Sequence, residues 1–219
     1  MSRAPTARLF VAIDPPAPIR HELAAWARLA VAGMRGGERP DGARTVRLLE
    51  PETMHLTLCF LGSRPVEELA GVVAAVEELA ASGGELALGA PLWLPPRRPR
   101  TLALTVHDRH GELAQLHEAV ARAVSSAIDW QPERRRFRAH ITVARLGRER
   151  SRGQGSSPAQ RALPPTPQLS FTAREVVLYR SWLAPGGASY EALAAGSLEA
   201  SSSEPSPDGD GLDSGLGAP

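Results

Sequence analysis

The sequences MHLTLCFL, at residues 54–61, and RAHITVAR, at residues 138–145, decide the fold of this chain. Each is a short apolar run with β-branched residues, which is typical of a buried strand. Each also contains a His-x-Thr motif that is followed at once by another apolar residue. The same pattern at two distant places indicates an internal duplication, and its period is too long for a solenoid of about 20–50 residues per repeat.

The segments before the two motifs show the same order of elements. Residues 8–14 (RLFVAID) and residues 101–106 both predict a strand, and a helix follows each of them. The first helix begins at Pro15, ends at Gly33, Gly36 and Gly37, and has Ile19, Leu23, Trp26, Ala27 and Ala30 at helical spacing. The second covers about 109–128, with Leu113, Leu116, Val120, Val124 and Ala127 facing inward. We therefore expect two similar halves that face each other across a cleft.

Turn-forming residues divide the rest of the chain. We expect further strands at 45–49, 85–88, 170–179 and 190–193, and a helix from Pro65 to Gly83 with Val66, Leu69, Val73, Val76 and Leu79 on one face. Residues 91–100 are rich in proline and arginine, and residues 146–169 are expected to form a long mobile loop. The predicted organisation is a flexible N-terminus (1–7), one folded domain (8–195) and a disordered tail (196–219) that has five acidic and no basic residues.

The chemistry of the His-x-Thr motif follows from strand geometry. Residues two apart in a strand point to the same face, so His55 lies beside Thr57 and His140 beside Thr142. If the halves face each other, the cleft holds two imidazoles and two hydroxyls. Histidine titrates near neutral pH, so one imidazole can accept a proton from water while the other protonates the leaving oxygen. The threonine hydroxyls can donate to the phosphate oxygens where charge develops. This set suits phosphodiester cleavage with neither metal nor cofactor.

One such motif alone is a weak signal, because many histidines are structural. Two copies, in matching places of a duplicated chain, are much stronger. Composition excludes several other chemistries. The chain has no lysine, so a Schiff base, a lysine–nucleotide adduct and a phosphate-loop lysine are all impossible. Its only cysteine, Cys59, cannot form an intramolecular disulfide. With no apolar run of about 18 residues and no signal peptide, we expect a cytoplasmic protein that does not span a membrane.

The sequence resembles the 2H phosphoesterases, and within them the bacterial RNA 2′,3′-cyclic phosphodiesterases, also known as 2′-5′ RNA ligases. The matching strings are RLFVAID at 8–14, MHLTLCFLG at 54–62, FRAHITVAR at 137–145 and VVLYRSWLAPGGASYEAL at 176–193. The resemblance implies a bilobal α+β fold, a pseudo-twofold duplication in which two antiparallel sheets line a central cleft and the helices lie outside. It also implies hydrolysis of RNA 2′,3′-cyclic phosphate ends to a 2′-phosphomonoester. In that scheme His55 is the proton donor, His140 the proton acceptor, and Thr57 and Thr142 complete the site.

Two positions depart from the pattern that the resemblance implies. The family often has proline before the second histidine, where this chain has Ala139, and lysine after the first motif, where it has Cys59. Alternation predicts that Cys59 points the same way as His55 and Thr57. We interpret it as structural, because no base for thiol chemistry is evident.

Three further residues are candidates for substrate binding. Arginine binds phosphate through a planar fork, and eight arginines fall within 134–152. Of these, Arg138 and Arg145 flank the motif strand, and alternation places Arg138 on the face of His140. A solvated face is the alternative interpretation of the cluster. Phe10 can stack a base, with core packing as its alternative role.

A metal site at His107, His110 and His117 is not predicted, because their spacing crosses a helix start and lacks cysteine or carboxylate partners. His21 is expected to be exposed on the first helix. The predicted function is therefore that of a monomeric, cofactor-free RNA 2′,3′-cyclic phosphodiesterase. The alternatives are a 2′-5′ RNA ligase, a phosphodiesterase for a small cyclic nucleotide, and a module that binds RNA or a nucleotide without turnover.

Overall fold

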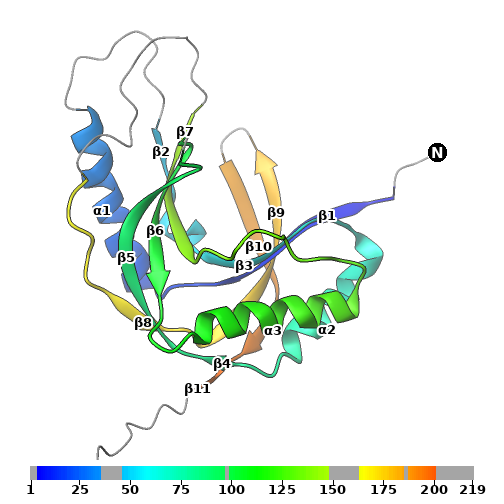
Figure 1. Ribbon diagram of the computed structural model, residues 1–219. Helices are drawn as coiled ribbons and strands as arrows, with labels where there is room; N and C mark the ends of the chain where they lie inside the picture. The colour runs from blue at the N-terminus through cyan, green and yellow to red at the C-terminus, as the bar shows by residue number, and fades with distance from the viewer. Residues whose placement is uncertain (1–3, 36–45, 97–98, 148–162, 185–186, 201–219) are drawn as a thin grey trace, which may run out of the picture.

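The structure, a computed structural model, describes residues 4–35, 46–96, 99–147, 163–184 and 187–200 (Figure 1). Several expectations fall outside these residues. They are the glycine stop at Gly36 and Gly37, most of the 146–169 loop, and the tail beyond residue 200.

The first half of the chain begins with the expected strand and helix. A short 3₁₀ turn, Pro51–Thr53, stands just before the first His-x-Thr strand. A second one, Val66–Glu68, leads into the next helix. The elements in order are β1 (Thr6–Ile13), α1 (Ala17–Arg35), β2 (Val46–Leu48), β3 (Leu56–Pro65) and α2 (Leu69–Glu77).

The second half contains the other His-x-Thr strand and the strands that close the sheet. Strand β7 begins at the second motif histidine, and β9 and β10 form a hairpin. The elements in order are β4 (Ser82–Gly83), β5 (Glu85–Leu94), β6 (Thr101–His107), α3 (Glu112–Ala127), β7 (His140–Leu146), β8 (Ser170–Thr172), β9 (Glu175–Ala184), β10 (Gly187–Ser197) and β11 (Glu199–Ala200).

Within the described residues, nine of the strands form one curled antiparallel sheet. Its order is β10-β9-β1-β3-β7-β6-β5-β8, with β2 paired to β7, and a small parallel pair, β4 with β11, stands apart. The two halves of the sheet meet where β3 lies beside β7, and the register there joins them through Leu56 opposite Ile141. This confirms the α+β class and the two-part architecture. The two sheets expected from the resemblance are the halves of this single sheet (Figure 1).

Several element boundaries differ from those expected. Strand β1 begins at Thr6, and Ala7 is only 2% exposed, so the ordered chain starts inside the predicted flexible segment 1–7. Strand β10 runs through the predicted boundary at 195 to Ser197, because its backbone stays paired with β9. Strand β5 continues to Leu94 although it contains Pro91, which stands at a register shift where a missing N–H is tolerated. The single strand predicted at 170–179 is two, β8 and β9.

The helices lie on the outside of the sheet, as expected. Helix α1 buries Leu23, Trp26, Ala27 and Ala30, with Ile19 partly buried, which confirms its predicted face. Helix α3 buries Leu113, Leu116, Val120 and Val124 as predicted, but Ala127, the last residue of the helix, is exposed. The predicted face of α2 is partly wrong. Val72 and Val76 are buried, whereas Val66 is 37% exposed because it belongs to the 3₁₀ turn, whose angular spacing differs. None of the helices in the described residues has the length and apolar character that a membrane span needs.

Helix α2 packs so closely on β10 that the strand requires glycine at position 196. A Cβ atom there would lie 2.1 Å from the carbonyl oxygen of Val76, a backbone atom that cannot turn away. We expect Gly196→Ala to lower the free energy of unfolding by about 1–3 kcal/mol. The neighbouring Ser197→Ala, at an exposed position, should change it by about 0.5 kcal/mol or less. Urea unfolding measures both, and equal midpoints for the two variants would contradict the close contact.

Candidate active site

All four motif residues line one cavity at the junction of the two halves. The cavity measures about 220 Å³ and is lined by Leu49, Thr53, His55, Thr57, Leu94, Thr101, His140, Thr142, Arg145 and Tyr190. The junction pair, Leu56 and Ile141, explains why. Each is fully buried between its histidine and its threonine, so alternation turns those two side chains to the other face. The sequence pattern therefore predicted this arrangement, although His55 stands one residue before β3 begins.

The two imidazoles are held in the same way. The Nδ1 atom of His55 lies 2.9 Å from the carbonyl oxygen of Thr53, and Nδ1 of His140 lies 2.7 Å from the carbonyl oxygen of Arg138. A carbonyl can only accept, so each Nδ1 carries a proton and donates it. This leaves Nε2 of each neutral ring as an acceptor for chemistry in the cavity.

An aromatic cluster surrounds the His55 ring. Phe10 of β1 stacks on it with 4.7 Å between centroids, Tyr190 of β10 meets it edge-on at 5.2 Å, and Tyr179 of β9 lies 6.4 Å away. Phe10 is only 4% exposed. It therefore has no free face for stacking a base, which corrects its prediction as a substrate-binding residue. Its position beneath His55 fixes the imidazole plane.

Burial in this cluster changes the proton affinity of His55. Desolvation disfavours the charged ring and lowers its pKa from 6.5 to about 4, against the opposing effects of the Thr53 carbonyl and of Asp14. Asp14 accepts a 2.5 Å hydrogen bond from the Tyr179 hydroxyl, and burial and this bond raise the phenol pKa above its ordinary value. At this pKa the His55 ring is neutral at pH 7.

The two arginines predicted to bind substrate, Arg138 and Arg145, lie differently relative to the cavity. Arg145 lines the cavity, as a phosphate-binding residue would. Arg138 is exposed and is not among the lining residues; its contribution is the carbonyl that holds His140. Alternation failed for Arg138 because β7 begins only at His140, two residues later. Arg134 and Arg135 are exposed as well, and the cluster beyond residue 147 lies outside the described residues.

The expected direction of Cys59 is also wrong, and a β-bulge is the cause. In the pairing of β1 with β3, Ala12 lies opposite Thr57 and Val11 opposite Cys59, so Leu58 is an extra residue. Cys59 therefore faces α3, where its sulfur lies 3.8 Å from Nδ1 of His117. It is 3% exposed, and burial raises the thiol pKa to about 12, which favours the structural interpretation.

The bulge gives His117 a structural partner. Its Nδ1 atom lies 3.1 Å from the carbonyl oxygen of Leu58, and its ring stacks on Phe137 at 4.2 Å. It thus links the first motif strand to the segment before the second motif. His107 instead meets Thr105 on β6, and His21 is exposed, as predicted.

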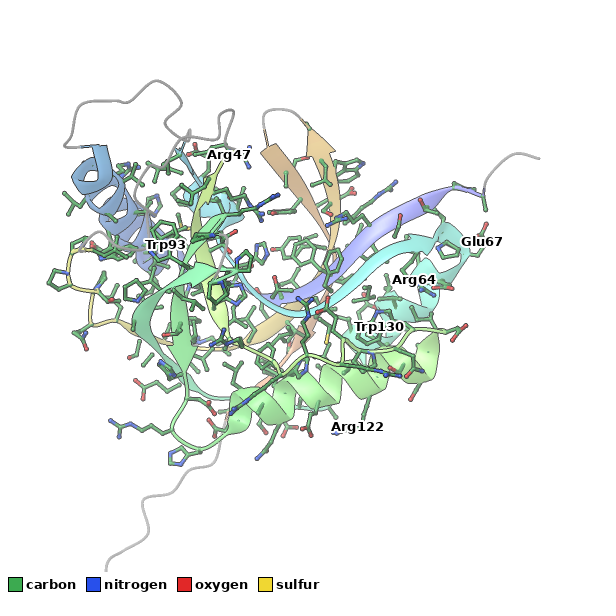
Figure 2. All side chains as sticks on the ribbon, turned by 45° about the horizontal axis from the view of Figure 1, so that its top comes forward. Arg47, Arg64, Glu67, Trp93, Arg122 and Trp130 are labelled. Carbon is green, nitrogen blue, oxygen red and sulfur yellow. The ribbon has the colours of Figure 1, made fainter. Side chains whose placement is uncertain are left out.

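Sequence reasoning missed Tyr190, which lines the cavity, and Tyr179, whose ring lies 6.4 Å from that of His55. Tyr179 and Tyr190 are the only tyrosines of the chain, and both fall in the β9–β10 hairpin. The occurrence of both tyrosines in one short segment was the sequence feature that could have indicated a role at the site. Arg47 of β2, labelled in Figure 2, reaches the same hairpin from the other half. A Cβ on Gly187 would lie 2.4 Å from Nη1 of Arg47, so the guanidinium of Arg47 lies directly against the hairpin at this glycine.

The sequence and the fold are similar to those of known proteins. The RNA 2′,3′-cyclic phosphodiesterase of Archaeoglobus fulgidus is 29% identical over 143 residues, which are 65% of this chain and 74% of that protein. The crystal structure of E. coli LigT complexed with 3′-AMP matches with a TM-score of 0.66 at 25% identity, covering 89% of this chain and 99% of that one. The crystal structure of TT0787 of Thermus thermophilus matches with a TM-score of 0.66 at 26% identity, covering 88% and 98%. Residues 15–182 match the 2′-5′ RNA ligase superfamily, so the chain belongs to this family of 2H phosphoesterases.

Proposed function

We propose that the protein hydrolyses the 2′,3′-cyclic phosphate ends of RNA to 2′-phosphomonoesters, without a metal ion. The observation that carries the proposal is that His55, Thr57, His140 and Thr142 all line the same cavity. The family of phosphodiesterase- and ligase-type enzymes and the name of the archaeal relative support the choice of substrate.

The proposed reaction uses each group once. One histidine takes a proton from water through Nε2 as the water oxygen bonds to phosphorus. The bond from phosphorus to the ribose 3′-oxygen breaks, and the other histidine, protonated beforehand, gives that oxygen its proton. Thr57 and Thr142 donate hydrogen bonds to the non-bridging oxygens, and Arg145 adds positive charge at the same wall of the cavity. The product carries a 2′-phosphate, and the base and acid exchange protonation states for the next turnover.

The resemblance assigns the donor role to His55 and the acceptor role to His140. A proton donor must be protonated before it acts, whereas a pKa of about 4 leaves His55 neutral at pH 7, so this assignment requires the substrate to raise the pKa of His55. A bound phosphate anion has this effect, since an opposite charge within about 4–6 Å favours the imidazolium.

We therefore expect 2′-AMP, which ends in the product phosphate, to raise the pKa of His55 by about 1–3 units from its value near 4. Titration of the His55 ring signals by NMR, with and without 2′-AMP, measures this shift. The His55 signals are assigned with His55→Gln. If the pKa stays near 4 with the ligand bound, His55 is the base and His140 the donor.

Ligation is the alternative reaction. In it an RNA 5′-hydroxyl, in place of water, attacks the cyclic phosphate, and the superfamily name supports this possibility. A test offers a cyclic-phosphate oligonucleotide together with an excess of a 5′-hydroxyl oligonucleotide. We expect the 2′-phosphate product to dominate. A joined 2′-5′ product as the main species would favour the ligase, and tight binding without turnover would favour the binding module.

A further inference from the structure

The side of the sheet that carries the catalytic cavity extends along β1 and β3 beyond the cavity itself. Cross-strand partners point to the same side, and Phe10, which faces His55, lies opposite Phe60 in the register of β1 with β3. Arg8, two residues before Phe10, shares that side and lies opposite Ser63. The other side carries the helices, because Cys59 contacts His117 of α3 there.

Two β-bulges in β3 keep Thr57, Phe60 and Ser63 on the cavity side of the sheet. Leu58 and Leu61 are both extra residues in the pairing with β1. Regular alternation from Thr57 would turn Phe60 toward the helices, whereas the bulge at Leu58 turns it to the cavity side. Figure 2 shows β1 and β3 running together from the middle of the molecule toward the end where Arg64 is labelled.

Arg8 and Phe60 form an exposed pair on this face. The guanidinium carbon of Arg8 lies 4.6 Å from the centroid of the Phe60 ring, Phe60 is 38% exposed, and Arg8 is exposed too. Within the described residues Arg8 forms no ion pair with a carboxylate. Just beyond the pair, the hydroxyls of Thr6 and Ser63 lie 3.2 Å apart. A planar cation, an aromatic ring and two hydroxyls are the groups that bind bases and the sugar–phosphate backbone of single-stranded RNA.

The size of the cavity explains why such a site is needed. At about 220 Å³ it is smaller than the roughly 300–1,000 Å³ of pockets that enclose a whole drug-sized ligand. It can hold a cyclic phosphate and its ribose, but the rest of an RNA end must lie outside. Two residues along a strand cover about 7 Å, so Arg8 lies about 7 Å beyond Phe10 along β1. Phe10 in turn lies between Arg8 and the His55 ring on which it stacks.

We propose that Arg8 and Phe60 are a stacking platform for the base of the penultimate nucleotide of the RNA, the one that precedes the cyclic-phosphate terminus. The proposal rests on the proposed function, and it makes the enzyme selective for RNA ends over cyclic mononucleotides. The chain offers a matched control in Arg180 and Trp182. Their separation is 4.9 Å and Trp182 is 42% exposed, but Arg180 pairs with the buried Leu9 and so faces the opposite side of the sheet.

The test compares kcat/KM for the dinucleotide ApA with a 2′,3′-cyclic end and for 2′,3′-cyclic AMP. We expect the wild-type protein to prefer the dinucleotide. Arg8→Gln and Phe60→Leu should each reduce this preference, on the order of 10-fold, because base stacking on a side chain is lost. Phe60→Tyr, which keeps the ring, should preserve it, and so should Arg180→Gln and Trp182→Leu. Circular dichroism confirms that each variant is folded.

Two results would overturn the platform. One is a wild-type protein without preference for the dinucleotide, and the other is a preference that survives both Arg8→Gln and Phe60→Leu. The same ratio, measured as binding of ApA 2′-phosphate against 2′-AMP, does not depend on turnover. If neither cyclic substrate is hydrolysed, the proposed function fails, while the binding ratio still decides whether the platform exists.

Discussion

Substituting alanine for His55 or for His140 is expected to lower kcat about 10²–10⁴-fold in each case, on an oligonucleotide with a 2′,3′-cyclic end. Both rings line the one cavity, and each is held by a carbonyl that leaves Nε2 as the reactive atom. Because one ring accepts and the other donates in the same reaction, the double variant should lose little more than either single one.

Two controls separate this chemistry from a loss of structure. His55→Gln fills most of the space beside Phe10 but cannot exchange protons, so it should be as inactive as His55→Ala. His21→Ala, at an exposed position of α1, should keep full activity. Turnover within a factor of a few of the wild-type value in either single alanine variant would show that the two motifs do not form the catalytic pair.

Removing a hydroxyl from either motif threonine is the second large effect. We expect Thr57→Val and Thr142→Val each to reduce kcat about 10²–10³-fold, the usual loss when one donor to a developing oxyanion is removed. Valine keeps the shape and the β-branched preference for a strand, so the fold should not change. Thr172→Val, at an exposed position of β8, is the matched control.

The division between kcat and KM tests the role of these threonines. A hydroxyl that acts only where charge develops lowers kcat and leaves KM nearly unchanged. A rise in KM with unchanged kcat would show that the threonine only holds the substrate, and it would contradict the oxyanion role.

The sequence was sufficient to predict the centre of the site. A strand forces residues two apart onto one face, so the pairing of His55 with Thr57 and of His140 with Thr142 needed only the two apolar motifs. The absence of lysine likewise excluded lysine-based chemistry before any geometry was known. Both inferences depend on local features of the sequence, and no register shift falls between Leu56 and Thr57 or between His140 and Thr142.

Other features could not be predicted, because they depend on pairing between distant segments. The bulge at Leu58 reverses the direction of Cys59, and only the register of β1 with β3 reveals it. The late start of β7 removes Arg138 from the cavity wall. Phe10 was predicted to contact substrate, but its position beneath His55 follows from the meeting of β1 and β3.

The aromatic surroundings of His55 were missed for the same reason. Tyr179 and Tyr190 reach the site through the β9–β10 hairpin, which lies more than a hundred residues from the first motif in the chain. Their effect is the burial that lowers the pKa of His55. The sequence of one strand does not indicate which side chains from distant segments will pack on it.

The most direct test of the account is the identity of the RNA end that the protein produces. The full chain is incubated with an oligonucleotide ending in a 2′,3′-cyclic phosphate, in the presence of EDTA, and the product end is identified by mass spectrometry and by digestion with an enzyme specific for 3′-phosphates. We predict complete conversion to a 2′-phosphate at an undiminished rate. A 3′-phosphate product would contradict the proposed cleavage of the bond to the 3′-oxygen, and activity that the chelator abolishes would contradict metal-independent catalysis by His55 and His140.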